Sequence, residues 1–217
     1  MDMDTSVERP ARSRLPLLIL AILTSIVAAA SLLALGNSQP PSDSSPEAGF
    51  ARDMAVHHAQ AVEMSFIMRD ASPDEPLRVL TYDIIVTQTA QRGIFMGWLQ
   101  QWGLNQSGER PVMAWMAGHG HGATAPASAT MPGMAGEEEL KRLREATGEE
   151  QETLFLQLMI RHHEGGVQMS QALLKLSDRD EVASMAGHIV NAQAGEIKLM
   201  TDMLRQRGAQ PLPSILK

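Results

Sequence analysis

Several residue types are scarce or absent in this chain of 217 residues, and each absence excludes a class of function. The chain has no cysteine, which excludes disulfide frameworks, thiolate zinc sites, thiol nucleophiles and iron–sulfur clusters. With 18 basic against 25 acidic residues the formal net charge is −7, so the composition lacks the basic character of nucleic-acid-binding proteins. Strand-like alternation of apolar and polar residues is also absent, which favours an all-α protein.

One long hydrophobic run lies near the N-terminus. Positions 15–35 carry no charged residue, and a helix of that length spans about 31 Å, close to the thickness of a bilayer core. Three arginines precede the run and the next basic residue is Arg52. The positive-inside rule therefore predicts a cytoplasmic tail at 1–14, a single-pass membrane anchor at 15–36 and an extracytoplasmic domain, joined by a flexible linker at 37–47. A cleaved signal peptide, which would release a secreted protein, is the alternative.

From position 50 onward the chain repeats itself at a constant shift of 105 residues. The repeated positions include Phe50/Phe155, Met54/Met159, His57-His58/His162-His163, Met64-Ser65/Met169-Ser170, Gln88/Gln193 and Gly103/Gly208. A repeat of this length indicates one helical hairpin that has been duplicated, with copies that bury their apolar faces together. We predict a four-helix domain over 48–211, with hairpin one at 48–104, a connection at 105–136 and hairpin two at 137–211.

Local start signals divide each hairpin into two helices. Ser45 and Pro46 are typical of a helix start, and a second start is predicted at Ser72, as a cap, with Pro73 in the first turn. In the second copy, a short acidic helix precedes the helix that carries the second histidine pair. The prediction is an all-α, antiparallel four-helix bundle.

Methionine and histidine are the unusual residues, with 15 Met and 7 His in the chain. Residues three, four, seven and ten apart share one face of a helix, so each copy carries a stripe of both types. We predict that the two stripes converge on a common centre and hold a metal ion. Methionine as adaptable core filler is the plain alternative, but the histidine pair occurs twice at equivalent positions. The predicted ligands are Met54, His57, His58, Met64, Met159, His162, His163, Met169, Met185 and His188.

The connection between the hairpins is rich in Gly, Ala, Pro and Ser, yet it also concentrates methionine and histidine. Four of the seven histidines in the chain have methionine three residues earlier, where chance would give about half of one such pair. One of these pairs lies in the connection, where core packing offers no explanation. The connection therefore predicts a secondary metal site made of Met113, Met116, His119, His121, Met131 and Met134.

The donor types select the metal. Thioether sulfur is soft and neutral, so it favours Cu(I), and by the same argument Ag(I), over Mg²⁺, Ca²⁺ or Fe(III). Outside the cytoplasm, thioethers also avoid the oxidation to disulfide that a thiol site would risk. Three polar residues on the partner helices, Gln88, Gln193 and Glu196, are candidates to orient the imidazoles, although a solvated polar seam would look the same in the sequence.

The segments MAVHHAQAVEM (54–64), MIRHHEGGVQM (159–169) and MPGM (131–134) resemble the domain of unknown function 305 family, which includes CopM-like extracytoplasmic copper-binding proteins. The resemblance implies a ferritin-like four-helix fold and an association with copper and silver. It also implies ligand roles for the Met and His residues of the two helical segments. The first copy has Ala59-Gln60 where the second has Glu164-Gly165, so the two half-sites are not equivalent in sequence.

The combined prediction is an extracytoplasmic copper-binding protein without catalytic turnover, which sequesters the metal, confers resistance or passes it on. Its expected partners are the metal ion and, through the N-terminal helix, the membrane, with no nucleic acid. A copper donor or acceptor protein and a second copy of the chain stay open as partners. Two alternatives remain: a ferritin-like di-iron oxidase, although no histidine has glutamate three residues earlier, and a bundle with a structural or interaction role that binds no metal.

Overall fold

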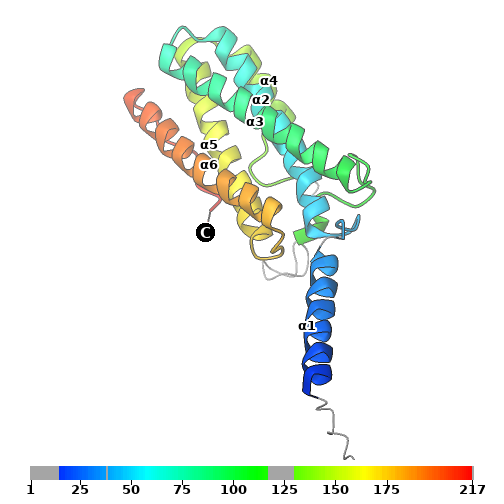
Figure 1. Ribbon diagram of the computed structural model, residues 1–217. Helices are drawn as coiled ribbons and strands as arrows, with labels where there is room; N and C mark the ends of the chain where they lie inside the picture. The colour runs from blue at the N-terminus through cyan, green and yellow to red at the C-terminus, as the bar shows by residue number, and fades with distance from the viewer. Residues whose placement is uncertain (1–14, 38, 117–129, 217) are drawn as a thin grey trace, which may run out of the picture. The chain divides into compact units, whose positions relative to one another are not determined.

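The computed structural model describes residues 15–37, 39–116 and 130–216 (Figure 1). Within these residues the protein is helical and has no strand, which confirms the all-α prediction. The chain divides into two units, Met1–Pro40 and Pro41–Lys217. The helices are α1 (Leu15–Asn37), α2 (Pro46–Ala71), α3 (Glu75–Gln101), the short 3₁₀ helix η1 (Ala114–Met116), α4 (Glu137–Glu145), α5 (Gly148–Leu173) and α6 (Asp180–Gln206).

The first unit contains α1, which covers the hydrophobic run identified in the sequence. Its described side chains, such as Ile22 and Val27, are exposed. Judged on the residues that the structure describes, no helix of the chain combines the length and the hydropathy needed to cross a membrane. The anchor at 15–36 therefore stays a prediction from the sequence without structural support, and the tail at 1–14 lies outside the described residues.

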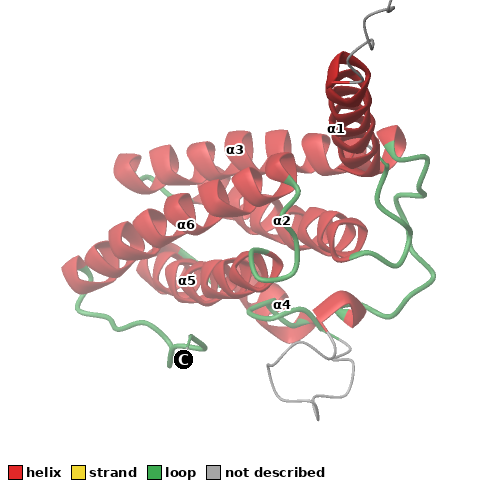
Figure 2. Cartoon of the chain, turned by 60° about the horizontal axis from the view of Figure 1, so that its bottom comes forward, coloured by secondary structure: helices red, strands yellow, loops and turns green. Residues whose placement is uncertain are grey.

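The second unit is built from four long helices arranged as two hairpins (Figures 1 and 2). In hairpin one α2 packs along α3, and in hairpin two α5 packs along α6. The hairpins meet through α2 and α5, whereas α3 and α6 have no extensive contact with each other. As a result α2 and α5 form the centre of the bundle, and the helices that carry the histidine pairs are the most buried ones.

Side-chain hydrogen bonds explain where α2 and α3 begin. The Ser45 side chain accepts a hydrogen bond from the Ala48 amide, and Pro46 opens α2 as expected. The predicted cap of the next helix was wrong: α3 is capped by Asp74, whose carboxylate accepts from the Leu77 amide. Ser72 cannot fill that role because its amide ends α2 on Met68 and its hydroxyl donates to another helix.

Two reciprocal hydrogen bonds show how the copies are related in space. The Ser72 hydroxyl, in the turn of hairpin one, donates to Glu152 near the start of α5 at 2.5 Å. The Ser177 hydroxyl, in the turn of hairpin two, donates to Glu47 near the start of α2. Both residues of one bond lie 105 positions from their counterparts in the other. Each hairpin therefore contacts the other through the same surface, as in a pseudo-twofold dimer fused into one chain.

Candidate metal centre

The two histidine pairs meet at the interface between α2 and α5. All four imidazoles, those of His57, His58, His162 and His163, are fully buried. The rings of His57 and His162 lie face to face, with centroids 3.8 Å apart and planes inclined by 31°. His58 and His163 flank this inner pair, with centroids 6.5 Å from His57 and 6.3 Å from His162, respectively. The structure thus brings together the four histidines that the sequence pairs.

Hydrogen bonds fix the tautomers of the inner pair. His57 Nε2 lies 3.0 Å from the Pro132 carbonyl oxygen, and His162 Nε2 lies 3.0 Å from the carbonyl oxygen of His57. A carbonyl oxygen can only accept, so Nε2 carries the proton in both rings. In a neutral imidazole the other nitrogen, Nδ1, then holds the free lone pair.

The outer histidines contact the flanking helices in the same way. His58 Nε2 donates to Gln91 Oε1 on α3 at 2.7 Å, and His163 Nε2 donates to Glu196 Oε2 on α6 at 2.6 Å. Gln91 and Glu196 are separated by the repeat shift of 105. The orienting contact expected of Glu196 is therefore present, and Gln91 supplies its counterpart in the first copy.

The four Nδ1 atoms are buried and have no hydrogen-bond partner. Burial lowers the pKa of His57 to about 4, and burial together with the neighbouring His57 lowers the pKa of His58 to about 3. Burial also holds the pKa of His162 well below its usual range. These three rings are consequently neutral at pH 7, and their unprotonated Nδ1 lone pairs are left in the buried interior. This donor set fits a metal ion that imidazole nitrogen can bind, with Nε2 held by the outer contact.

Further buried polar groups of the bundle lack hydrogen-bond partners. Among the described residues, the hydroxyls of Ser65 and Ser170 and the amide atoms of Gln88 and Gln193 are also buried without partners. Each pair is again related by the shift of 105. Gln88 and Gln193 do not hydrogen-bond to the imidazoles, so the orienting role expected of them is not observed. The two serines were not among the predicted site residues, although the Met-Ser dipeptide is repeated in the sequence.

The methionines lie in two hydrophobic clusters and not in one. The first, here the Met64 cluster, contains Met64 of α2 and Met159 of α5; the second, the Met54 cluster, contains Met54 of α2 and Met169 of α5. On both helices the histidine pair lies between the two methionines. Each cluster therefore contains one of these four predicted thioethers from each copy, and the packing does not gather all four in a single centre.

The remaining predicted ligands that the structure describes, on α6 and in the connection, do not lie among the four buried histidines. His188 is exposed on α6 and does not join the four buried histidines, whereas Met185 is partly buried against the Met54 cluster. His119 and His121 lie outside the described residues. The methionines of the connection, Met113, Met116, Met131 and Met134, also pack into or against the Met54 cluster.

The end of the connection covers one side of the site. Gly165 on α5 is so close to this segment that a Cβ atom there would lie 2.0 Å from the Pro132 carbonyl oxygen. On the α2 side, the Gln60 amide group exchanges two hydrogen bonds with the backbone of Ala135, at 2.7 and 2.9 Å. Gly133 has a positive φ of 75°, a conformation that suits glycine. The connection is therefore anchored on both central helices beside the inner histidine pair.

Carboxylates contribute little to this centre. Glu63 pairs with Arg144, and Glu164 accepts from the Ser214 hydroxyl and the Ile215 amide at 2.6 and 2.9 Å. Among the residues that the structure describes, no three His, Asp or Glu side chains are grouped to hold a metal ion. The described residues therefore do not form the carboxylate cage of a di-iron site.

Comparison with known proteins identifies a family match and several similar solved structures. The chain matches the domain of unknown function 305 (DUF305) family over residues 47–204. A DUF305 protein from Streptomyces coelicolor is 43% identical, with a TM-score of 0.72, and the match covers 79% of this chain and 99% of that one. A DUF305 fragment from Deinococcus radiodurans is 34% identical, with a TM-score of 0.62, over 74% of this chain and 96% of that one.

CopM in its Cu(I)-bound form is 25% identical, with a TM-score of 0.56, and the match covers 75% of this chain and 96% of CopM. No curated protein sequence matches the chain. The protein belongs to the DUF305 family.

Proposed function

We propose that this protein binds Cu(I), and by the same chemistry Ag(I), between α2 and α5. One observation carries the proposal: four buried Nδ1 atoms, two from each copy, have no hydrogen-bond partner, and a cluster with thioethers lies on each side of the histidine pairs. Leaving such polar atoms unpaired in a protein interior costs about 1–3 kcal/mol each. Thioether sulfur is a soft ligand that Cu(I) prefers, and unprotonated imidazole nitrogen also binds copper.

The relatives support the choice of metal. CopM, at 25–28% identity, has structures with Cu(I), Cu(II) and Ag bound. The DUF305 family itself is of unknown function, so the likeness suggests a class of ligand and no particular physiological role. The buried imidazole and thioether groups of this chain agree with a soft monovalent ion as the ligand.

The proposed role is sequestration or transfer of the metal outside the cytoplasm, without turnover. The Streptomyces coelicolor relative is designated a candidate secreted protein, which agrees with the extracytoplasmic location predicted from the sequence. The methionines of the connection join the Met54 cluster, so this segment is placed to deliver an ion to the buried site or to cover it. A membrane anchor and a copper-exchanging partner protein belong to the same proposal.

A titration of the full chain with Cu(I) against a competing chelator tests the proposal. We expect tight binding that is lost when His57 and His162 are replaced by Asn, because each change removes an inner Nδ1 donor. His188→Asn, at the exposed histidine, serves as the matched control and should bind as the wild type does. Unchanged affinity in the double variant, with helicity intact by circular dichroism, would remove the buried site from consideration.

Nitrogen-15 NMR of histidine-labelled protein with Ag(I) identifies the donor atom. Ag(I) is diamagnetic, so the imidazole nitrogens stay observable in the loaded protein. The Nδ1 resonances of the buried rings should shift on binding, whereas the protonated Nε2 resonances keep the pattern set by their acceptors. A shift confined to Nε2 would contradict the proposed geometry.

A further inference from the structure

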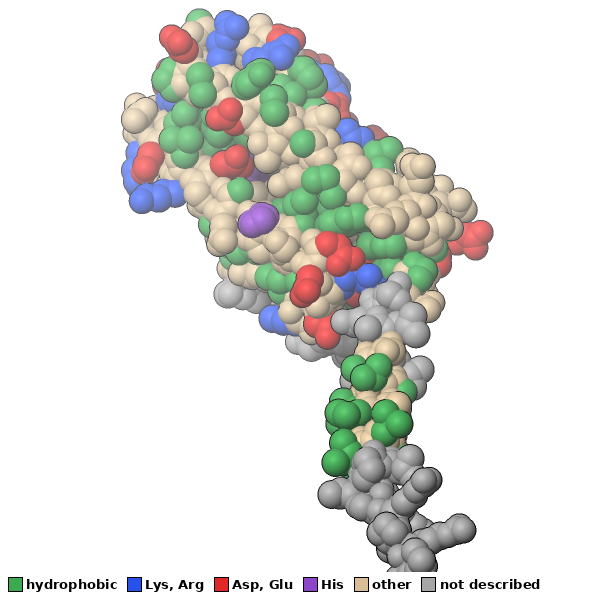
Figure 3. Space-filling model, in the orientation of Figure 1, with side chains coloured by type: hydrophobic (Ala, Val, Ile, Leu, Met, Phe, Trp, Pro, Cys, Tyr) green, Lys and Arg blue, Asp and Glu red, His purple; other side chains and the backbone are tan. Residues whose placement is uncertain are grey.

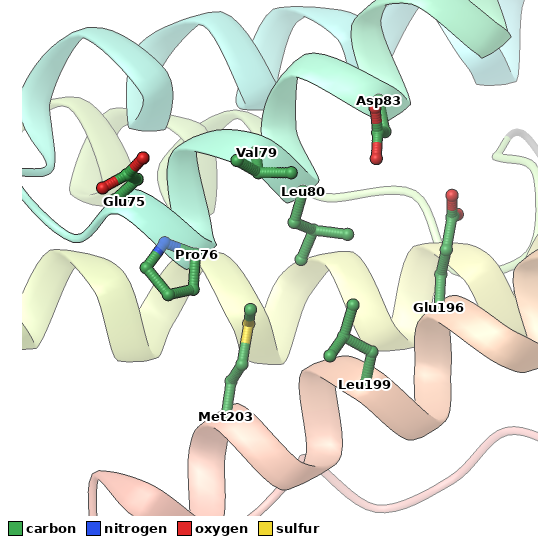
Figure 4. Close-up of a pocket in the computed structure, with 8 residues that line it drawn as sticks. All are labelled: Glu75, Pro76, Val79, Leu80, Asp83, Glu196, Leu199 and Met203. Atoms are coloured by element: carbon green, nitrogen blue, oxygen red, sulfur yellow. The ribbon is translucent and has the colours of Figure 1, made fainter.

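A groove runs between α3 and α6, the two long helices that do not pack on each other. It has a volume of about 470 Å³. The face of the molecule in Figure 3 carries hydrophobic side chains next to acidic ones on its upper part. The groove shows the same mixture, and its walls are formed by Glu75, Pro76, Val79, Leu80 and Asp83 of α3 and by Glu196, Leu199 and Met203 of α6 (Figure 4).

The chemistry of the groove suits a soft cation. Asp83 and Glu196 lie on opposite walls, and Figure 4 shows both carboxylates at the same end of the groove. Met203 brings a thioether toward the space from α6. Two carboxylates in an apolar groove raise the local concentration of cations, and thioether sulfur favours Cu(I) and Ag(I) among them.

Glu196 connects this groove to the buried histidines. Its side chain is 23% exposed, while its Oε2 atom lies 2.6 Å from Nε2 of the fully buried His163. The other nitrogen of the same ring is one of the four unpartnered Nδ1 atoms. One side chain therefore contacts both the groove and the proposed metal centre, and no other groove residue hydrogen-bonds to a histidine of the site.

The repeat shows that these features belong to one end of the bundle alone. At a shift of 105 the counterparts of Asp83, Glu196 and Met203 are His188, Gln91 and Trp98. Gln91 is uncharged, and Trp98 packs against the Met54 cluster and stacks on Trp102 with ring centroids 6.0 Å apart. The equivalent region thus has bulky aromatic rings where the groove has a thioether, and it lacks both carboxylates.

We propose that the monovalent metal ion enters and leaves the buried centre through the α3–α6 groove, where Asp83, Glu196 and Met203 bind it transiently before it reaches His163. The inference rests on the proposed function and adds a route and a second, weaker metal subsite to it. A small apolar organic molecule is the other occupant that the groove could take, and the test distinguishes the two.

Blocking the groove tests the route. In the full chain, Val79→Trp combined with Leu199→Trp fills the groove from both walls at exposed positions. Cu(I) transfer from a coloured chelator complex should slow about tenfold in loading and unloading alike, because access then needs an opening of the helices. The affinity for Cu(I) should stay unchanged, since no ligand of the buried centre is altered.

The matched control is Ile94→Trp with Ser184→Trp. These positions are the counterparts of Leu199 and Val79 in the repeat, and this variant should load Cu(I) at the wild-type rate.

Two milder variants separate a metal route from a site for an organic molecule. Asp83→Asn should lower the loading rate and its dependence on salt, and Met203→Leu, which preserves volume, should slow loading without loss of stability. Equal loading rates in the blocked variant and its control would overturn the route while leaving the buried site in place. Absence of Cu(I) binding by the wild type would instead overturn the proposed function itself. Slowing in the blocked variant with no effect of D83N or M203L would overturn the metal subsite and favour an apolar occupant.

Discussion

The two halves of the domain carry the same histidine pair in the same position, yet the surroundings of the pairs differ. In the first half His57 donates to the connection at Pro132, and His58 donates to the neutral amide of Gln91. In the second half His162 donates to the backbone of the first half, and His163 donates to the carboxylate of Glu196. The duplication thus sets the positions of the four rings, while single residues on neighbouring segments make the half-sites unequal.

The chain has one connection between its two hairpins, so only one side of the pseudo-twofold histidine site is covered by it. Gly165 and Gln60 determine which side this is. Gly165 lets the connection approach α5, because any Cβ atom there would overlap Pro132. Gln60, at the equivalent position of α2, holds the same segment by two hydrogen bonds to Ala135. The same residue at both equivalent positions could not have given room for Pro132 on α5 and also hydrogen bonds to Ala135 on α2.

The largest effect is expected when one half-site is removed. Because the inner rings of both halves are stacked in one interface, we expect either double variant, H57A/H58A or H162A/H163A, to weaken Cu(I) binding at least about a hundredfold. Competition titrations with each variant, with helicity checked in parallel, measure this. If one double variant retained a full-affinity ion and the other did not, the half-sites would be independent and the shared centre would be wrong.

The second effect concerns the metal-free protein at low pH. The folded-state pKa values of His57 and His58, about 4 and 3, lie below the ordinary value of 6.5, so the unfolded chain binds protons that the folded chain excludes. Stability is therefore fully present above pH 6.5 and is lost as the pH falls toward 4, by about 3 kcal/mol for His57 alone. Urea unfolding at pH 7.5 and at pH 5 measures the loss.

The sequence was sufficient for much of this architecture because the relevant signals are local or repeated. Apolar spacing and capping residues predicted the long helices, with an error at the start of α3 because Ser72 and Asp74 both suit a cap. The constant shift of 105 predicted that the histidine pairs would face each other, which the stacked inner rings show. As metal ligands, these residues remain predictions.

Features that depend on contacts between distant segments could not be predicted from the spacing of residues in the sequence. The separation of the thioethers into two clusters follows from the antiparallel packing of α2 on α5, which places Met54 beside Met169 and not beside Met159. The exposure of His188 likewise depends on the rotation of α6, although its Met-x-x-His spacing equals that of the buried pairs. The choice of Nδ1 as donor depends on Pro132, 75 residues away from His57.

A smaller effect is expected from the glycine that distinguishes the halves. Gly165→Ala should destabilise the fold by about 1–3 kcal/mol, because the new methyl group forces the connection away from α5. Gly195→Ala is the matched control, since nothing lies within 4 Å of a Cβ atom at this exposed site on α6, and it should stabilise α6 by about 0.5–1 kcal/mol. Thermal unfolding of both variants measures the difference. Equal behaviour of the two would show that the contact between Pro132 and Gly165 does not constrain the connection.

The smallest effect tests the charge difference between the half-sites directly. Glu196→Gln gives both outer histidines a neutral acceptor, and Gln91→Glu gives both a carboxylate. A carboxylate on Nε2–H makes the imidazole a stronger donor at Nδ1, so E196Q should weaken Cu(I) binding about tenfold, the lower end of the range for such contacts, and Q91E should strengthen it. The double exchange, E196Q/Q91E, moves the carboxylate to the other half and should restore the wild-type affinity if the halves share one ion.

Loading rates separate the effect of Glu196 on affinity from its role in the groove. The double exchange should restore the affinity for Cu(I) but not the loading rate, because the groove lies beside Glu196 and not beside Gln91. If the double exchange restored both the affinity and the rate, or neither of them, the assignment of two roles to Glu196 would be wrong.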